Sequence, residues 1–324
     1  MKTWNETLEV LSAAQACIQG GHSCAIVILT HVKGSAFRRP GAKLLIRADG
    51  SMTGNVSGGC LENDLRERAL TAMQTGLQET VHYNTGSDED VIWGLGLGCD
   101  GELDLLLVPI APPGAWVATV LGEMSKFESI TLAWSIVPGP ALAPQIAANK
   151  EDHLYLDVLE PPPDLVIVGA GDDAIPLVAL AAESGFRVTV ADHRPGYLSP
   201  DRFPRAVSIV HTRPESAAGK LPASPRTMVL IKNHALEMDK KWGAHFDRTD
   251  VAYIGLLGPQ KRCDKIRAGM TSGNLTRVYG PAGLDVGSEG AEQIAVAIVA
   301  ELIAVHAGRT PGHLRHREAP IHGR

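Results

Sequence analysis

The stretch from Leu165 to Asp192 constrains the fold more than any other part of the chain. It reads LVIVGAGDDAIPLVALAAESGFRVTVAD: a short apolar run, a glycine-rich turn, a helix-forming segment and a second apolar run. Short all-apolar runs are typical of strands that are buried on both faces of a parallel sheet. A strand, a glycine turn, a helix and a strand that ends in an acid form the dinucleotide-binding β-α-β unit. The sequence therefore predicts a Rossmann-like parallel-sheet domain in the C-terminal half.

The glycine turn of this unit is the candidate nucleotide site. Gly169, Gly171 and Ala174 match the G-x-G-x-x-G/A spacing, and Asp192 ends the second strand. Gly169 permits the tight turn, Gly171 lets the backbone approach a pyrophosphate, and the helix N-terminus offers N–H groups to anionic oxygens. Asp192 can accept a hydrogen bond from a ribose hydroxyl. A nucleotide such as NAD or FAD is the ligand that this pattern favours.

Two carboxylates oppose a standard nucleotide site. Asp172 and Asp173 stand where the phosphates would approach, and their charges would repel them. A domain can also keep this fold and bind no nucleotide. Three alternatives therefore stay open for it: a scaffold, a nucleotide-binding sensor and an NAD(P)-dependent oxidoreductase. Against the oxidoreductase, no Tyr-x-x-x-Lys pair stands near the motif.

Composition limits the kind of protein further. A length of 324 residues suits two domains, and a formal net charge of −6 offers no basic field for nucleic acid. No apolar run approaches the ~20 residues that span a bilayer, and the N-terminus MKTWNETLEV lacks the pattern of a signal peptide. Five scattered cysteines argue against a disulfide framework. We expect a cytoplasmic protein with neither a nucleic-acid nor a membrane partner.

A proline run marks the expected domain boundary. Glu160 is followed by three prolines, a stiff and extended sequence that is typical of a linker. We therefore expect an N-terminal α/β domain over 1–160, the Rossmann-like domain over 161–308, and a disordered tail over 309–324. In the N-terminal domain, the pattern predicts a helix over 5–18, a strand over 24–32 and a hairpin over 43–56 around Asp49-Gly50.

Two cysteines in glycine-rich segments are the candidate reactive groups. Cys60 follows Ser57-Gly58-Gly59 near the expected start of a helix, where the helix dipole lowers the pKa of a thiol. Cys99 lies among glycines at 94, 96, 98 and 101. Thiols in such loops can bind a soft metal or handle sulfur; the alternative, which spacing alone favours for both cysteines, is that they are simply small residues in tight turns. The chain has no C-x-x-C zinc pair and no G-x-S-x-G or H-E-x-x-H motif.

Several blocks of sequence resemble one known family. GSAFRRPGAKLLIRADGSMTGNVSGGCLE is similar to the signature of the xanthine dehydrogenase accessory factor family, XdhC/CoxI, and GLGLGCDGELDLLLVP to its second glycine block. The segments GAGDDAIPLVALAAESGFRVTVADHRP, YIGLLGPQKR and GPAGLDVGSEGAEQIAVAIVAELIA resemble its Rossmann half. The blocks keep the order of the family and extend over most of the chain.

The resemblance implies an accessory protein, or chaperone, for the molybdenum cofactor (molybdopterin). Such a protein assists sulfuration of the cofactor and passes it to the apo-enzyme of a xanthine dehydrogenase-type molybdenum hydroxylase, without turnover of its own. The implied partners are that apo-enzyme and a cysteine desulfurase. A homo-oligomer is also expected, because the cofactor needs shielding, and the apolar-faced helix expected over 291–305 can serve as its interface or as core.

The resemblance also implies a set of cofactor-binding residues. The S-G-G-C-x-E block falls on Ser57, Gly58, Gly59, Cys60 and Glu62, with Cys60 as a possible molybdenum ligand, and the cysteine of the second block falls on Cys99. Because guanidinium groups bind phosphate in a fork, Arg38 and Arg39 are candidate partners for the cofactor's phosphate, or else solvated loop charges.

The chain departs from the family pattern at three places. Phe37 stands where the family usually has proline, and Asp100 stands where it usually has glycine. The family's T-H-D block appears only as NHALEMD, which keeps His234 and not its neighbours.

Overall fold

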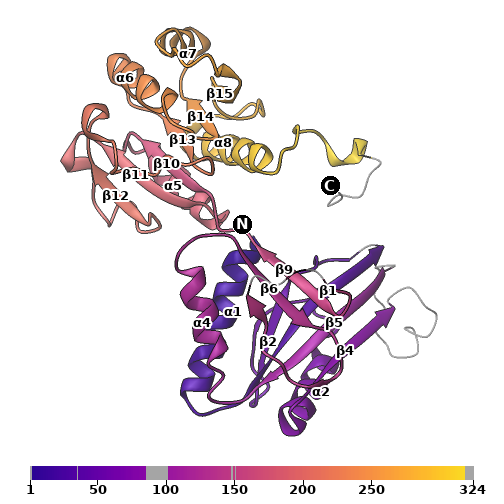
Figure 1. Cartoon of the computed structure of the whole chain (residues 1–324). Coiled ribbons are helices and arrows are strands. Elements are labelled where there is room, and N and C mark those ends of the chain that lie inside the picture. The colour runs from indigo at the N-terminus through magenta and orange to yellow at the C-terminus, as the bar shows by residue number, and fades with distance from the viewer. Residues whose placement is uncertain (1, 35, 85–100, 147–148, 150, 318–324) are drawn as a thin grey trace. The chain divides into compact units, whose positions relative to one another are not determined.

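The computed structural model describes residues 2–34, 36–84, 101–146, 149 and 151–317. The chain divides into two compact units, Met1–Pro162 and Pro163–Arg324, and their boundary falls inside the proline run. The first unit contains antiparallel sheets and the second a parallel sheet, so the predicted α/β class with a Rossmann-like C-terminal part is confirmed (Figure 1). In the described part of the chain, no helix has the length and apolar character needed to cross a bilayer.

The first unit is built on a six-stranded antiparallel sheet in the order β3-β2-β1-β5-β4-β7. Its strands are β1 (Cys24–Gly34), β2 (Lys43–Arg47), β3 (Met52–Gly54), β4 (Leu77–Asn84), β5 (Gly101–Ile110) and β7 (Gly139–Pro140). A smaller sheet in the order β8-β6-β9 contains β6 (Ile130–Ser135), β8 (Gln145–Ile146) and β9 (Leu154–Leu159). The helices are α1 (Lys2–Gln19), α2 (Glu62–Thr75) and α4 (Trp116–Met124).

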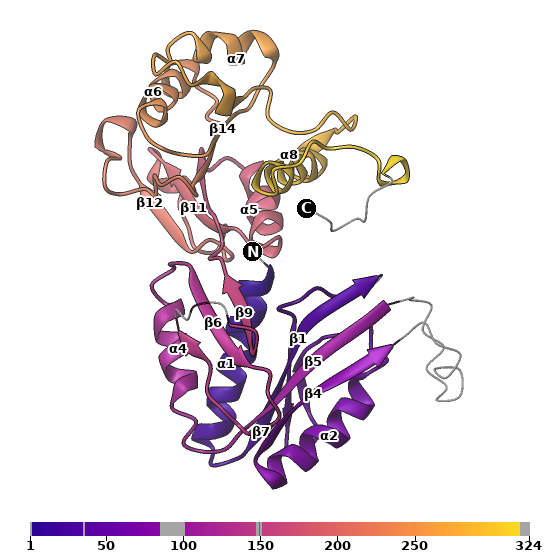
Figure 2. The same ribbon diagram turned by 45° about the vertical axis from the view of Figure 1, so that its right-hand side comes forward.

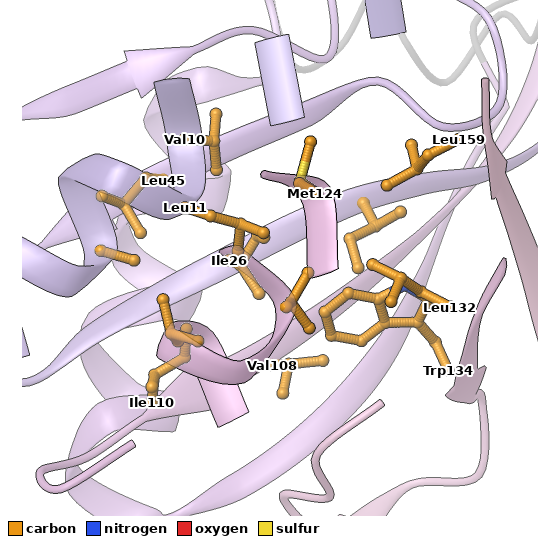
Figure 3. Packing of buried hydrophobic residues seen from close by; sticks show 14 of the residues in the cluster. Val10, Leu11, Ile26, Leu45, Val108, Ile110, Met124, Leu132, Trp134 and Leu159 are labelled. Carbon is orange, nitrogen blue, oxygen red and sulfur yellow. The ribbon is translucent and has the colours of Figure 1, made fainter. Parts of the chain in front are cut away.

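Both faces of the large sheet are buried, because alternate residues of its strands enter two different cores. In β1, Ile26 and Ile28 pack with residues of α1, α4 and the small sheet (Figure 3). Val27 and Leu29 point to the other face, where α2 covers the sheet with Leu65 and other apolar residues. This second core lies under the Cys60 loop and holds it in place, since Cys60 itself packs against it.

A charged pair is buried where the two sheets of the first unit meet. The Lys43 ammonium, at the start of β2, lies 2.6 Å from the Asp157 carboxylate of β9, and both side chains are almost fully buried. Lys43 also donates to the hydroxyl of Thr7 in α1 and to the backbone carbonyl of Gly41. One buried lysine therefore joins a helix and two sheets.

The second unit is a six-stranded parallel sheet in the order β12-β11-β10-β13-β14-β15. The strands are β10 (Asp164–Val168), β11 (Arg187–Asp192), β12 (Ser208–His211), β13 (Met228–Ile231), β14 (Tyr253–Leu256) and β15 (Val278–Tyr279). Numbered by position in the chain, this is the 3-2-1-4-5-6 order of a doubly wound dinucleotide-binding sheet, in which the strand order reverses between the first and fourth strands, here β10 and β13.

The helices of the second unit follow the β-α-β scheme, with two exceptions. They are α5 (Ala174–Glu183), α6 (Leu236–Asp247), α7 (Gln260–Arg267) and α8 (Gly290–His306), and α8 packs against α5. Between β12 and β13 the chain makes only the short 3-10 turn η2 (Pro214–Ser216), and between β11 and β12 it makes only the short 3-10 turn η1 (Pro195–Tyr197). This connection is proline-rich, and prolines inside a helix remove hydrogen bonds. Figure 2 shows β11 beside α5.

Candidate functional site

The Cys60 loop is ordered by the hydroxyl of Ser57. This buried hydroxyl donates to Oε2 of Glu62 at 2.6 Å, and it accepts from the N–H of Gly59 at 3.0 Å and from the Cys60 thiol at 3.5 Å. Gly59 has φ +108°, a backbone conformation that side chains with a Cβ rarely adopt. The S-G-G-C-x-E block is thus one hydrogen-bonded turn that holds a half-buried thiol.

The helix behind this turn begins slightly later than its sequence suggests. α2 begins at Glu62, two residues after Cys60, and the N–H of Leu61 at the helix start donates to the Glu62 carboxylate at 3.1 Å. Part of the helix's anion-binding capacity is therefore used by a residue of the same block. The other oxygen of Glu62, Oε1, is buried and has no hydrogen-bond partner within the described residues.

The loop with the two arginines lies next to the Cys60 turn. A Cβ placed on Gly58 would lie 3.9 Å from the ring of Phe37. Arg38 makes a bidentate ion pair with Glu6 of α1, so a ligand phosphate would have to compete with that carboxylate. Arg39 differs, since its Nε atom is buried without a hydrogen-bond partner in the described structure. Of the two arginines, Arg39 is the better candidate for an anionic group.

The remaining candidate thiol is not described. Cys99, with the neighbouring Asp100 and the glycines at 94, 96 and 98, lies outside the described residues. Within the described residues, no group of three or more His, Cys, Asp or Glu side chains is arranged to hold a metal ion. The assignment of Cys60 as a metal ligand therefore stays a prediction that rests on the Cys60 loop alone.

In the second unit, the glycine turn has the close approaches that its sequence predicts. Gly169 has φ +114°, and a Cβ there would lie 2.7 Å from the backbone carbonyl oxygen of Lys232. Ala174 is fully buried as the first residue of α5. A Cβ on Gly171 would lie 2.8 Å from Oδ1 of Asp173 and 3.5 Å from Nε2 of His234. Space over Gly171 is thus already bordered by a carboxylate and an imidazole.

Asp192 binds the protein's own donors with both carboxylate oxygens. Oδ2 accepts from the N–H of Ala170 at 2.8 Å and from Nη2 of Arg194 at 2.9 Å. Oδ1 accepts from the N–H and the Nε of Arg194 at 2.8 and 3.0 Å. Asp192 therefore ties the glycine turn to β11, and a ribose hydroxyl would have to share oxygens that already bind four N–H donors.

The pKa of Asp192 makes the stability of the fold sensitive to acid. Burial opposes its ionisation, but the hydrogen bonds from Arg194 and Ala170 outweigh burial and lower the pKa from 3.8 to about 2. A lowered carboxyl pKa stabilises the folded state above the unfolded pKa, and this contribution is lost as the pH falls through the folded pKa. We expect roughly 2–3 kcal/mol of unfolding free energy to be lost between about pH 4 and pH 2. The free energy of unfolding in urea, measured over this pH range, checks the prediction. An Asp192→Asn variant that loses as much stability in acid as the parent protein would contradict it.

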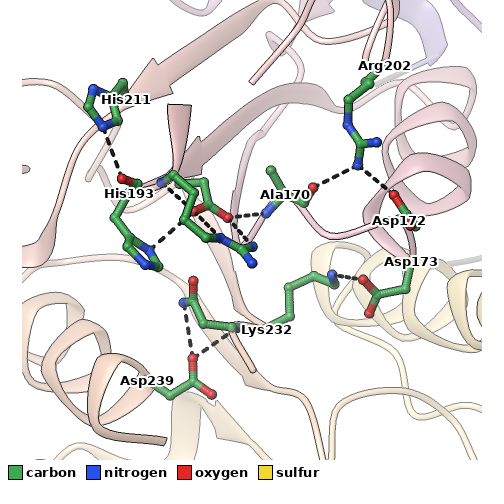
Figure 4. Close-up of polar contacts among 11 residues, drawn as sticks. Ala170, Asp172, Asp173, His193, Arg202, His211, Lys232 and Asp239 are labelled. Atoms are coloured by element: carbon green, nitrogen blue, oxygen red, sulfur yellow. Dashed lines mark hydrogen bonds and ion pairs between the residues drawn. The ribbon is translucent and has the colours of Figure 1, made fainter. Parts of the chain in front are cut away.

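The two carboxylates that were expected to repel phosphate each have a cationic partner. Nη2 of Arg202 donates to Asp172 at 2.9 Å and to the carbonyl of Ala170 at 3.1 Å. Nζ of Lys232 donates to Asp173 at 2.6 Å (Figure 4). The charges at the start of α5 are therefore balanced, and the expected repulsion is weaker than the sequence alone suggests.

A pocket of about 270 Å³ lies at the carboxyl edge of the parallel sheet, and Lys232, Asn233 and Arg262 line it with Asp173 and His234. Asn233 and His234 belong to the NHALEMD block and Arg262 ends the YIGLLGPQKR block, but the sequence alone assigned no binding role to Lys232, Asn233 or Arg262. Their position at the sheet edge could have indicated a binding role, because Lys232 directly follows β13, next to the reversal in strand order.

The fold and the site define a class of two-unit protein: an antiparallel unit with a cysteine in a glycine loop, followed by a Rossmann unit. A family model described as the XdhC Rossmann domain matches residues 165–302, and one described as the XdhC and CoxI family matches residues 17–84. The chain belongs to the XdhC and CoxI family, as its motifs predicted.

Similar proteins match along most of the chain. A Bacillus subtilis (strain 168) protein, named as a probable subunit of xanthine dehydrogenase, is 29% identical over 89% of this chain and 94% of its own length. The molybdenum cofactor insertion chaperone PaoD of Escherichia coli (strain K12) is 24% identical over 91% of this chain and 87% of its own. A crystal structure described as a xanthine dehydrogenase from Bacillus halodurans has a TM-score of 0.81 and 28% identity, and the match covers 93% of this chain and 97% of that one.

Proposed function

We propose that this protein is an accessory protein that binds the molybdenum cofactor and delivers it to a molybdenum hydroxylase of the xanthine dehydrogenase type. The observation that carries the proposal is the Cys60 turn, a half-buried thiol on a loop fixed by Ser57 and Glu62. Membership of the XdhC and CoxI family and similarity to a protein named as a cofactor insertion chaperone support it.

The chemical groups at and beside the Cys60 turn suit the molybdenum cofactor. Thiolate is a suitable ligand for a soft metal, and the cofactor supplies the molybdenum that it would bind. Buried Nε of Arg39, which has no partner within the described residues, suits an anionic oxygen. Buried Oε1 of Glu62, likewise without a partner there, suits an N–H or O–H group of a pterin.

The partners follow from the same proposal. The protein assists sulfuration of the cofactor, receives sulfur from a cysteine desulfurase and passes the cofactor to the hydroxylase apo-enzyme. It acts as a homo-oligomer in the cytoplasm, with the exposed side chains of α8, among them Ile294 and Val296, as the candidate interface.

The molybdenum and pterin content of the full-length protein tests the proposal. Protein purified from a host that makes the cofactor is expected to carry both, with the absorbance of a bound pterin. A protein free of molybdenum and pterin under these conditions, and unable to take up added cofactor, would contradict it.

We further propose that the Rossmann unit binds a nucleotide such as NAD or FAD. The 3-2-1-4-5-6 strand order and the positive φ of Gly169 support this. NAD(P)-dependent oxidoreduction is the second candidate function that this unit favours, and it would show as oxidation or reduction of a bound nicotinamide.

Gly171→Val is expected to weaken nucleotide binding at least about tenfold, because its side chain fills space that a phosphate needs. It would press on the Asp173 carboxylate, the mobile end of a side chain, so the fold should survive. Calorimetry with NAD, FAD and cytidine and adenine nucleotides checks the prediction. Gly196→Val is the matched control, since a Cβ there meets nothing within 4 Å. Equal affinities in both variants would place the nucleotide elsewhere.

A further inference from the structure

The pocket at the carboxyl edge of the second unit contains more polar chemistry than the fold requires. We call it the Lys232 pocket; it is lined by Asp173, Lys232, Asn233, His234, Gly258 and Arg262. Its walls come from the starts of α5 and α7 and from the segments that follow β13 and β14. Ligands of doubly wound sheets bind at this edge, where the strand order reverses. At about 270 Å³, the pocket suits one small group.

The ion pair in the pocket is asymmetric. The side chain of Lys232 is 1% exposed, whereas that of its partner Asp173 is 40% exposed. Burial lowers the pKa of Lys232, and Asp173 opposes this effect. A buried ammonium needs a counter-charge. Here the counter-charge is the Asp173 carboxylate, which lies at the edge of solvent and can rotate outward at little cost.

A second group in the pocket lacks a partner. Oδ1 of Asn233 is buried and makes no hydrogen bond within the described residues, and the residue is 6% exposed. The side-chain nitrogen of Asn233 donates to Oδ1 of Asp239 at 3.1 Å, which fixes the amide so that Oδ1 stays the acceptor. A buried acceptor without a donor is costly, so a ligand that brings an O–H or N–H to it gains affinity.

Arg262 supplies the second cation of the pocket. Its Nη2 atom donates to Asp239 at 2.6 Å and to the backbone carbonyl of Asn233 at 2.9 Å. Asp239 is fully buried and cannot leave, so the Arg262–Asp239 pair is permanent. If Asp173 swings out, one cation, Lys232, is left without its counter-charge, and one anionic ligand group restores the balance.

The position of Asp173 indicates the chemistry of that group. Its carboxylate lies over Gly171, the close-approach glycine of the turn, so that a Cβ there would be 2.8 Å from Oδ1. In dinucleotide-binding turns this is the space that a phosphate approaches. Asp173 is therefore an internal stand-in for a phosphate, bound to the same ammonium that a phosphate would bind (Figure 4).

We propose that the Lys232 pocket binds a phosphorylated sugar, the ribose phosphate part of a nucleotide, and that its phosphate displaces Asp173 from Lys232 while a sugar hydroxyl donates to Asn233 Oδ1. The inference rests on the nucleotide part of the proposed function and is independent of the cofactor part. It makes Asp173 a negative regulator of binding and Lys232 the phosphate-binding cation.

Calorimetry on the full-length protein with ribose 5-phosphate, inorganic phosphate and adenosine monophosphate tests the proposal. Asp173→Asn removes the competing charge and is expected to tighten ribose 5-phosphate about tenfold, because a like charge beside the phosphate is lost. In that background Lys232→Met is expected to abolish binding. Inorganic phosphate, which has no sugar hydroxyl for Asn233, is expected to bind more weakly than ribose 5-phosphate.

Asp172→Asn is the matched control. It removes the same charge from the neighbouring position, but Asp172 is paired with Arg202 and does not line the pocket. An equal gain in affinity for ribose 5-phosphate in Asp172→Asn would show that any negative charge near the turn weakens binding, and it would overturn the inference. Binding of adenosine monophosphate that ignores both Asp173 and Lys232 would overturn it and leave the nucleotide proposal standing. If none of the three phosphate ligands binds any folded variant, the inference about the Lys232 pocket and the proposal of nucleotide binding both fail. Cofactor loading at Cys60 is measured separately and does not depend on this result.

Discussion

Cys60→Ser is expected to leave the fold intact and to reduce molybdenum loading at least about tenfold, since even groups that only support a metal ligand contribute factors of 10–100. Serine keeps nearly the same volume and can donate the same hydrogen bond to Ser57, so the turn should persist. What is lost is a soft, ionisable ligand, which a hard neutral hydroxyl does not replace. The measurement is molybdenum and pterin content after reconstitution, with the melting temperature as the check on folding.

Cys17→Ser is the matched control for this variant. Cys17 is also half-buried in the first unit, but its thiol donates to the backbone carbonyls of His22 and Ser23, away from the glycine loop. Cys17→Ser should load normally, and Cys99→Ser should lose less than Cys60→Ser. Full loading of a folded Cys60→Ser protein would refute the assignment of Cys60 as the anchor.

Lys43→Met is expected to destabilise the protein by about 3–5 kcal/mol, because it leaves the carboxylate of Asp157 buried without its counter-charge. Methionine fills much of the lysine's volume, so lost packing contributes little. The variant also breaks hydrogen bonds that join β2 to Thr7 of α1 and to the Gly41 carbonyl. The free energy of unfolding in urea, compared with that of the parent protein at neutral pH, measures the loss.

The double variant Lys43→Met/Asp157→Leu separates charge from packing. Replacing both members of a buried ion pair by apolar residues is often neutral, so most of the stability should return. A double variant as unstable as Lys43→Met would show that loss of the hydrogen bonds to Thr7 and Gly41, and not the unpaired carboxylate, causes the destabilisation.

The parallel unit was the easier part to predict from sequence. Its strands are short apolar runs, and each β-α-β step is local in the chain, so Leu165 to Asp192 sufficed to set its class. In the first unit the hairpin of β2 and β3 was predicted correctly from Asp49-Gly50. The pairing of β1 with β5 joins residues far apart in sequence, and no local pattern encodes it.

The candidate sites show the same limit. The glycine spacing around Cys60 and Gly169 could be read from the sequence, because backbone conformation is a local property. The partners of the charged residues could not. Arg38 is paired with Glu6 and Asp173 with Lys232, and each pair depends on strands and helices coming together in the folded chain.

The carboxyl edge of the parallel sheet has one more consequence, for the rate at which a ligand arrives. Its acids are matched one to one with cations: Asp172 with Arg202, Asp173 with Lys232, Asp192 with Arg194 and Asp239 with Arg262. Matched pairs cancel at a distance, so this edge projects little field into solvent and does not steer anions from afar. An anion would therefore associate at an ordinary diffusive rate with weak dependence on ionic strength, and selection would take place only at contact, through exchange of ion-pair partners.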